Sequence, residues 1–242
     1  MINKILFRVV LSIIDILDSN NKKKIINFFK ESFSDRKIIV VDIGAHKGET
    51  IDIFLKYFNI EKIYSFEPND ELFIQLKRKN YDFERIKLFN LGIGEFSEIK
   101  NLNIFKDTSS STLNTINENS DYFKRKKKIM SFLMPFENFF KKKIIITICN
   151  LSEIIQKQKI KKIDILKIDT EGYEFNVLKG IVDSDFKYIR FIYFEHHYDL
   201  MINKGYKFSD INNLLKKKNF KLKYKLKMKF RKSFEYIYEN SK

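Results

Sequence analysis

The sequence has very little cysteine, proline and glycine, and these shortages exclude several kinds of protein. Cys149 is the one cysteine in 242 residues, so no intrachain disulfide can form and no zinc-finger spacing exists. A chain without disulfides suits the reducing cytoplasm, which is the compartment we expect. The 7 glycines and 2 prolines are few enough that each one marks a place where the backbone has a special requirement.

Long apolar runs are also missing. Residues 1–17 are rich in apolar side chains, but Lys4, Arg8 and Asp15 interrupt them, so we expect no transmembrane helix. No cleavage site of small residues follows, which argues against a signal peptide. The apolar residues recur at helical spacing, and we interpret residues 1–35 as an N-terminal amphipathic helical segment. This segment packs on its own domain or, alternatively, makes peripheral contact with a membrane.

Acidic side chains are outnumbered, with 31 Asp and Glu against 47 Lys and Arg and a net charge of +16. An excess of this size suits anionic partners such as nucleic acid, anionic lipid or a phosphorylated substrate. Composition offers a second explanation, which we favour, because Lys, Ile, Asn and Phe are frequent along the whole chain, as A+T-rich DNA would encode. No recognisable RNA-binding module is present, so we expect no nucleic-acid partner.

Short apolar runs without alternation indicate strands that are buried on both faces, as in a parallel sheet. These runs occupy residues 37–43, 62–66, 86–91, 163–168 and 189–194. Helical segments separate them, and this β-α-β-α-β order predicts an α/β fold with a doubly wound, mostly parallel sheet. Lys alternates with apolar residues over 220–230, and residues 234–238 can pair with that strand as an antiparallel hairpin at the sheet edge.

Residues 36–242 have the length of one large domain, within which residues 106–143 read as an insertion. The insertion has no clear periodicity, contains Pro135 and carries a basic run from Lys124 to Lys128. Segments of this length without a periodic hydrophobic pattern either serve a function or form solvent-exposed loops. We expect either a cover over a substrate site or a partly disordered loop, and both interpretations stay open.

Two glycines define a turn after the first strand. The residues Asp42-x-Gly44-x-x-x-Gly48 stand where a strand passes into a helix. Glycine lets the backbone turn tightly and lets a ligand approach without a Cβ in the way, and the helix offers free N–H groups at its start. The segment lacks the Gly-x-x-x-x-Gly-Lys-Ser/Thr of a P-loop, and Ala45-His46 breaks the Gly-x-Gly-x-x-Gly of a dinucleotide site.

An acidic residue, Glu67, closes the second strand 19 positions after Gly48. At this distance a carboxylate hydrogen-bonds a ribose in nucleotide-binding α/β folds, because it can accept from both hydroxyl groups. Pro68 follows directly, in the turn that leads into the next helix. The pairing of glycine turn and acid predicts an adenosine-containing ligand. A surface glutamate before a proline turn is the structural alternative.

Taken together, the motifs resemble the FkbM-type methyltransferase family. The resemblance rests on the motifs at residues 42–48, 66–68, 90–94, 165–174, 177–180 and 194–196. It covers residues 38–200, and the order of the motifs is more specific than any one of them. His46 stands where family members often have Asn. The resemblance implies a Rossmann-like class I fold that uses S-adenosylmethionine, mostly for O-methylation of sugars and natural products.

The resemblance also assigns roles by position. The turn from Gly44 to Gly48 would lie under the methionine part of the cofactor, Glu67 would hold the ribose, and Asn90 and Leu91 would flank the adenine. Residues 107–111 would line the acceptor side. The complete set of cofactor-binding residues that we predict is Asp42, Gly44, Ala45, His46, Gly48, Glu67, Pro68, Asn90 and Leu91.

A second group of polar residues surrounds the end of the strand at 163–168. Ligands of open α/β sheets bind beyond the carboxyl ends of the strands, so Asp169 and Glu171 should face the reaction site. Lys167 lies inside the strand, where an unpaired charge would be costly. We therefore expect Lys167 to pair with a carboxylate, and we predict Asp169 and Glu171 as catalytic residues.

Two of the three histidines, His196 and His197, stand together after Glu195. A histidine at the end of a core strand can act as a general base near neutral pH, and we add His196 to the catalytic set of Asp169 and Glu171. A structural histidine is the alternative. The same groups could bind a divalent cation, but their spacing matches no established signature, so we predict no metal.

These expectations lead to one functional hypothesis. The chain would be an S-adenosylmethionine-dependent methyltransferase that methylates a hydroxyl of a saccharide or small molecule, such as a sugar in a surface glycan. An RNA methyltransferase is the alternative enzyme, motivated by the positive charge and the lysine runs. A nucleotide-binding module that keeps only the fold is the non-enzymatic alternative.

Overall fold

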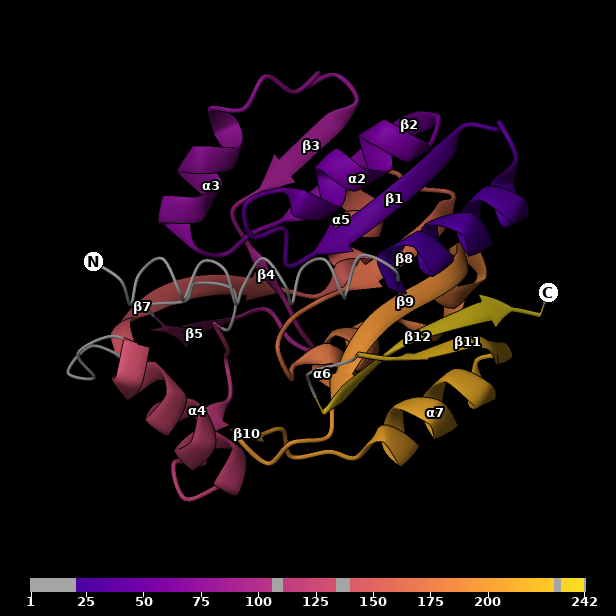
Figure 1. Ribbon diagram of the computed structural model, residues 1–242. Helices are drawn as coiled ribbons and strands as arrows, with labels where there is room; N and C mark the ends of the chain where they lie inside the picture. The colour runs from indigo at the N-terminus through magenta and orange to yellow at the C-terminus, as the bar shows by residue number, and fades with distance from the viewer. Residues whose placement is uncertain (1–20, 106–110, 134–139, 229–231, 242) are drawn as a thin grey trace.

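A computed structural model describes residues 21–105, 111–133, 140–228 and 232–241 (Figure 1). Its centre is a seven-stranded sheet in the order β11-β12-β9-β8-β1-β2-β3. The strands are β1 (Ile38–Ile43), β2 (Ile60–Phe66), β3 (Ile86–Phe89), β8 (Ile163–Ile168), β9 (Ile189–His197), β11 (Phe220–Lys227) and β12 (Ser233–Asn240). The expected membrane contact of the N-terminal segment lies mostly in residues 1–20, outside the described residues.

The pairing of the strands confirms the predicted doubly wound sheet with an antiparallel edge hairpin. β1 pairs in parallel with β2 and with β8, and the parallel order continues to β3 on one side and β9 on the other. β12 runs antiparallel to both β9 and β11. The sheet reverses order on either side of β1, so a crevice forms beyond the carboxyl ends of β1 and its neighbours, where ligands bind in folds of this kind.

Helices cover both faces of the sheet, which explains why its central strands β1, β8 and β9 are largely apolar. The helices are α2 (Glu49–Tyr57), α3 (Asp70–Lys77), α5 (Leu151–Lys157), α6 (Glu174–Lys179) and α7 (Phe208–Lys217). One face carries α2 and a helix at residues 21–33, whose Phe29 is 1% exposed and packs against Phe191 of β9. The other face carries α5, α6 and α7. Residues 21–33 therefore share the core of the domain.

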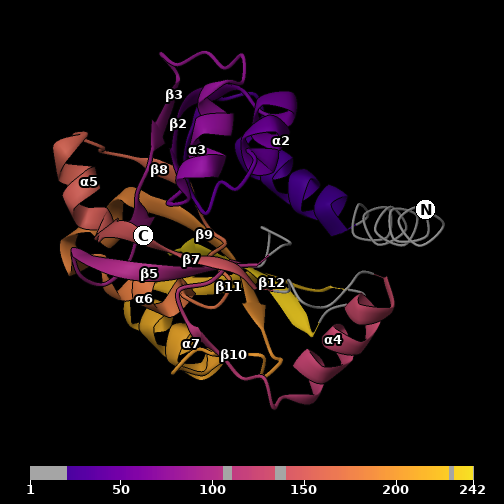
Figure 2. The ribbon, with the colours of Figure 1, turned by 90° about the vertical axis from the view of Figure 1, so that its left-hand side faces the viewer.

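A smaller sheet adjoins the carboxyl ends of the parallel strands. It consists of β5 (Glu98–Phe105), β7 (Phe140–Cys149) and the short β4 (Gly92–Ile93), in the order β4-β7-β5. Figure 2 shows β5 and β7 running across this side of the molecule. Leu102, Ile104, Ile146 and Ile148 form its own buried cluster.

The predicted insertion at residues 106–143 contains regular structure in its described part. β6 (Thr115–Ile116) pairs with β10 (Ile202–Asn203), and α4 (Asp121–Leu133) follows. Phe123 of α4 packs with Met201 and Ile202 of the segment after β9. The basic run thus lies on a helix, and the insertion is tied to the loop that follows β9. Within the described part of the chain, no helix is long and apolar enough to cross a membrane.

Candidate active site

A pocket opens at the carboxyl ends of β1, β2 and β8. It encloses about 640 Å³ of empty space, which includes space open to solvent. Apolar side chains from four places form much of its wall: Phe66 of β2, Leu72 of α3, Leu91 after β3 and Leu102 of β5. Glu67, Asp169 and Glu171 are its acidic members. The smaller sheet therefore closes one side of the pocket.

Gly44 is required at the base of this pocket. Its φ is +92°, and a Cβ added there would lie 2.0 Å from the backbone oxygen of Asp169. The close approach is maintained by backbone bonds, in which Gly44 N–H donates to Phe66 O at 3.0 Å and Asp169 N–H donates to Ile43 O at 2.9 Å. No other residue fits this position without moving the loop that carries Asp169.

Glu67 is held rigidly at the rim of the pocket. One carboxylate oxygen accepts from His46 N–H at 2.7 Å and the other from Asn69 N–H at 2.9 Å, and the residue is 6% exposed. Burial raises the pKa of Glu67 to about 7, although the two backbone N–H groups lower it. Each carboxylate oxygen keeps a lone pair for a further donor. The site thus presents an oriented acceptor to hydroxyl groups in the pocket.

The predicted cofactor residues divide into two groups. Five of them line the pocket: Gly44, His46, Glu67, Pro68 and Leu91. The other four do not: Asp42, Ala45, Gly48 and Asn90. Sequence spacing alone could not separate the two groups, because it does not show which residues of the turn face the pocket.

The four residues behind the pocket have structural contacts. Asp42 is fully buried and accepts from Ser65 Oγ at 2.9 Å. Ala45 is buried among the apolar residues near α2. Gly48 has φ +87° and precedes α2, where a Cβ would meet Tyr81 Oη at 2.4 Å. Asn90 Nδ2 donates to the backbone oxygen of Glu67 at 3.0 Å, so it positions the end of β2.

The predicted pairing of Lys167 is confirmed. Its Nζ lies 2.9 Å from Asp169 Oδ2. Burial opposes the charge of Lys167, but the carboxylates of Asp169 and Asp42 outweigh it and raise the pKa of the lysine. Asp42 and Lys167 are direct partners across β1 and β8, which brings the two charges together in the sheet. Lys167 therefore remains a cation beneath the pocket.

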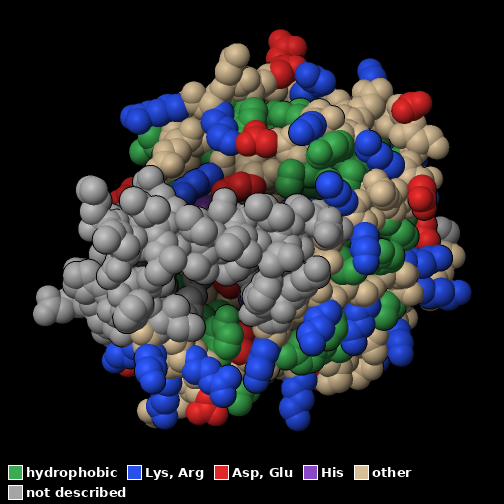
Figure 3. Space-filling view, viewed as in Figure 1, with side chains coloured by type: hydrophobic (Ala, Val, Ile, Leu, Met, Phe, Trp, Pro, Cys, Tyr) green, Lys and Arg blue, Asp and Glu red, His purple; other side chains and the backbone are tan. Residues whose placement is uncertain are grey.

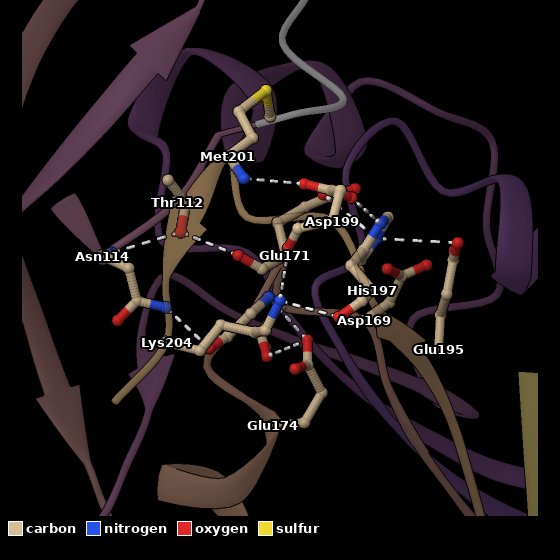
Figure 4. Close-up of polar contacts among 12 residues, drawn as sticks. Thr112, Asn114, Asp169, Glu171, Glu174, Glu195, His197, Asp199, Met201 and Lys204 are labelled. Carbon is tan, nitrogen blue, oxygen red and sulfur yellow. Dashed lines mark hydrogen bonds and ion pairs between the residues drawn. The ribbon is translucent and has the colours of Figure 1, made fainter. Parts of the chain in front are cut away.

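The loop after β8 has a strained and strongly supported backbone (Figure 4). Glu171 has φ +50°, a left-handed conformation that non-glycine residues rarely adopt, and Gly172 has φ +97°. Thr112 Oγ1 donates to Glu171 O at 2.8 Å, and Asn114 Nδ2 donates to Gly172 O at 2.6 Å. Gly172 N–H donates to Glu174 Oε1 at 2.8 Å. The first part of the insertion thus fixes the loop that carries Asp169 and Glu171.

The structure places His197, rather than His196, beside the pocket. Successive side chains of β9 point to opposite faces of the sheet, so only one of the two histidines can face Glu171. His196 is 2% exposed and lies among Tyr198, Tyr206 and Phe208 on the opposite face. Burial, followed by the charges of Lys204 and His197, lowers the pKa of His196 to about 4. These surroundings favour the structural histidine that was the alternative, and the catalytic role of His196 stays a prediction.

His197 is surrounded by carboxylates. Its Nε2 lies 3.5 Å from Glu171 Oε2 and 3.6 Å from Glu195 Oε1, and its Nδ1 lies 3.6 Å from Asp199 Oδ2. Burial alone would lower the pKa of His197, but these charges, with Glu171 first, raise it to about 10. His197 is therefore an imidazolium at neutral pH and has no free lone pair to accept a proton.

Acidic side chains outnumber basic ones around His197. We call the following residues the acid cluster: Asp169, Glu171, Glu174, Glu195, Asp199 and Glu235, with Lys167, His197 and Lys204 as its cations. Asp169 and Glu171 belong also to the pocket, so the two features are continuous. Sequence reasoning missed Asp199, Lys204 and Glu235, because their contribution depends on strand pairing and on the loop after β9.

No group of three or more His, Cys, Asp or Glu side chains in the described ranges has the arrangement of a metal site. The acid cluster is held by hydrogen bonds and ion pairs among its own members. Lys204 Nζ, for example, donates to the backbone oxygens of His197 at 2.7 Å and Asp199 at 3.2 Å. Glu174 accepts from Tyr206 Oη on its second oxygen.

The sheet order, the antiparallel β12 and the pocket beyond β1 define a Rossmann-like methyltransferase fold, which solved structures share. Residues 42–222 match the family model described as the methyltransferase FkbM domain, and the chain belongs to that family. The match begins in the last two residues of β1, includes the pocket and the acid cluster up to Lys204, and ends within β11. Among curated proteins, no sequence matches the chain.

Solved structures agree with this fold. Methyltransferase FkbM from Methylobacillus flagellatus KT superposes with a TM-score of 0.52 and 17% identity, over 84% of this chain and 44% of that one. This chain thus spans less than half the length of that relative. TrmK of M. capricolum, solved with S-adenosyl-homocysteine, gives a TM-score of 0.51 and 9% identity over 90% of this chain and 68% of its own. The METTL16 methyltransferase domain superposes with a TM-score of 0.51 and 11% identity, over 92% of this chain and 67% of that one.

Proposed function

We propose that this protein is an S-adenosylmethionine-dependent O-methyltransferase that acts on a hydroxyl group of a saccharide in the cytoplasm. The observation that carries the proposal is the continuity of an adenosine-type pocket, built on Gly44 and Glu67, with carboxylates on Asp169 and Glu171. Membership of the FkbM methyltransferase family supports the reaction type. The acceptor class rests on the family resemblance and on the acidic chemistry of the site.

The residues of the pocket fit the proposed cofactor. Gly44 leaves a cradle in which a Cβ would collide with Asp169 O, so the backbone can approach a ligand. Glu67 presents oxygens that two backbone N–H groups already orient, as two ribose hydroxyls require. Phe66, Leu91 and Leu102 supply apolar walls for an adenine ring. When bound, S-adenosylmethionine would supply a methyl group that its sulfonium has already activated.

Glu171 is the group that we assign to the proton of the acceptor hydroxyl. Its carboxylate lines the pocket. Thr112 Oγ1 donates a hydrogen bond to the backbone oxygen of Glu171 and so holds the backbone in place. The neighbouring imidazolium of His197, whose Nε2 lies 3.5 Å from Glu171 Oε2, holds this carboxylate in place at the edge of the pocket. Asp169, paired with Lys167, would orient the hydroxyl. Positioning of this kind and proton removal are the main tasks of the protein in methyl transfer.

The test is a transfer assay with methyl-labelled S-adenosylmethionine, in which the purified chain is offered polysaccharide extract and total RNA in parallel. We expect alkali-stable label in the polysaccharide. Label in the RNA alone would overturn the acceptor class. Absence of S-adenosylmethionine binding would overturn the cofactor and leave a module that keeps only the fold.

An RNA acceptor is the second candidate, and α4 is the observation that favours it. Lys124, Arg125 and Lys128 are exposed on this helix. Phosphate contacts of such residues give binding that weakens steeply with salt. Binding of total RNA that is lost between low and high salt, together with label in RNA, would favour this candidate over the saccharide.

A further inference from the structure

The unusual feature of the acid cluster is a pair of glutamates that face each other across two strands. Glu195 of β9 and Glu235 of β12 are direct partners in the antiparallel register. Like charges in directly opposite positions destabilise a sheet. Glu235 is only 8% exposed, and Glu195 is nearly as buried, so water gives them little relief. A pair of this kind needs a positive charge or hydrogen-bond donors nearby.

The cations of the cluster do not satisfy this pair completely. Tyr193 Oη donates to Glu235 Oε1 at 2.9 Å, but the buried Oε2 of Glu235 has no hydrogen-bond partner. The buried Oε1 of Glu195 likewise has no hydrogen bond, and its ion pair with His197 Nε2 is long at 3.6 Å. Lys167 directs its ammonium to Asp169 instead. Unpaired buried oxygens of this kind are costly and are seldom kept without a use.

The net charge of the whole acid cluster also indicates that a positive charge is needed there. Six carboxylic acids, on Asp169, Glu171, Glu174, Glu195, Asp199 and Glu235, stand against three cations, on Lys167, His197 and Lys204. The excess is therefore negative, in a chain whose net charge is +16. Burial, and then the charge of Glu195, raise the pKa of Glu235 to about 7, although Tyr193 and Lys167 lower it.

We propose that the acceptor is a saccharide that carries an ammonium group, and that the acid cluster binds that group next to the methylated hydroxyl. The inference rests on the proposed function, because it names the acceptor class of the same site. Asp169 and Glu171 are the members through which such a ligand would enter, with side chains 37% and 15% exposed. Glu195 and Glu235 contribute negative charge behind them. A phosphate or carboxylate on the acceptor would be repelled at the same place.

The cofactor does not account for the glutamate pair. The pocket that we assign to it is lined by residues at the ends of β1, β2 and β8 and by the smaller sheet. Glu195 and Glu235 do not line that pocket. His197 Nε2 contacts both Glu195 of the pair, at 3.6 Å, and Glu171 of the pocket, at 3.5 Å. Substitution of the pair should therefore change acceptor binding and leave cofactor binding as it is.

The test measures binding of four matched probes to the full chain saturated with S-adenosylhomocysteine. Glucosamine, methyl glucoside, glucuronate and glucose 6-phosphate share a ring and differ in charge. We expect glucosamine to bind about tenfold more tightly than methyl glucoside, the scale of one charge-assisted hydrogen bond, and the two anions to bind most weakly. Tightest binding of a neutral or anionic probe, or binding of none, overturns the inference.

Variants locate the effect in the glutamate pair. Glu195→Gln and Glu235→Gln should each remove most of the preference for glucosamine, while the affinity for S-adenosylhomocysteine stays within about twofold of the wild type. Glu239→Gln is the matched control, because Glu239 lies on the same strand but pairs with Lys223 at 3.0 Å, away from the cluster. If Glu239→Gln acts like Glu235→Gln, the proposed ammonium site is wrong. Failure to bind S-adenosylhomocysteine in the wild type would instead refute the proposed function.

Discussion

The pocket and the outer surface of this protein carry charge of opposite sign. Lys and Arg side chains spread over the face seen in Figure 3, and the exposed residues of α4 are largely basic. Acidic groups dominate the site, with Glu67 at one end and the acid cluster at the other. Overall charge would suggest an anionic substrate, whereas the acidic groups of the site are the basis of our proposal of a cationic one. The local chemistry decides, because ligands interact most strongly with buried charges nearby.

The largest effect should follow substitution inside the site. We expect Glu171→Gln to reduce the rate of methyl transfer by about 10²- to 10⁴-fold, the usual contribution of a general base. Affinity for S-adenosylhomocysteine should stay near that of the wild type. Single-turnover kinetics with labelled cofactor measure the change, and Glu118→Gln, an exposed acid of the insertion, is the control. A Glu171→Gln enzyme with the wild-type rate would remove Glu171 from the mechanism.

Cofactor affinity should depend on pH through Glu67. Hydroxyl donors bind the ionised carboxylate, and the pKa of Glu67 is raised to about 7, so protonation on going from pH 8 to pH 6 should weaken S-adenosylhomocysteine binding about tenfold. Asn69, His46 and Asp42 are the groups that act on this carboxyl. Calorimetry across the pH range measures the slope. Glu67→Gln should flatten it, and a slope that persists in the variant would assign the effect to another group.

The two histidines should respond differently to the same substitution. His197→Gln should slow methyl transfer about tenfold, because it removes the cation that lies 3.5 Å from Glu171 Oε2 and holds that carboxylate in position. His196→Gln should lower stability, since His196 is buried among aromatic rings, and affect the rate less. Thermal unfolding and transfer kinetics of both variants separate the two effects. Equal losses of rate would show that strand alternation does not govern their roles.

Stability should also report the charge of His197. Its pKa is raised to about 10 from 6.5, so its stabilising contribution is complete below pH 6.5 and is lost as the pH rises toward 10. Urea unfolding of the wild type should therefore show a decline in free energy of unfolding over this window. His197→Gln should lack that part of the decline. A variant with an unchanged pH profile would mean that the three neighbouring carboxylates do not hold a proton on the ring.

The smallest effect on catalysis should follow changes on the outer surface. Replacing Lys124, Arg125 and Lys128 of α4 with Gln should weaken retention on heparin, because exposed cations give salt-dependent binding to polyanions. S-adenosylhomocysteine affinity and transfer to a small saccharide should stay within about twofold of the wild type. Loss of transfer to the small acceptor would show that α4 belongs to the site. The basic surface and the acidic pocket would then not be separate functional regions.

Sequence reasoning located the main sheet and the pocket, because each depends on local patterns. Apolar runs marked β1, β2, β8 and β9, and glycine and acid marked the ends of two of them. It selected His196 rather than His197 for the catalytic set, but this choice depends on which face of β9 meets the site, and a local pattern does not show that. The supports from Thr112 and Asn114 depend on residues nearly 60 positions apart in the chain, and no local pattern announces such contacts.

The most direct test of the account is calorimetric titration of S-adenosylhomocysteine and of NAD into the wild type and into Glu67→Gln. The account predicts that S-adenosylhomocysteine binds at a single site, that NAD does not compete with it, and that Glu67→Gln weakens binding at least about tenfold. Binding of NAD in its place, or an affinity for S-adenosylhomocysteine that does not depend on Glu67, would contradict the assignment of this pocket.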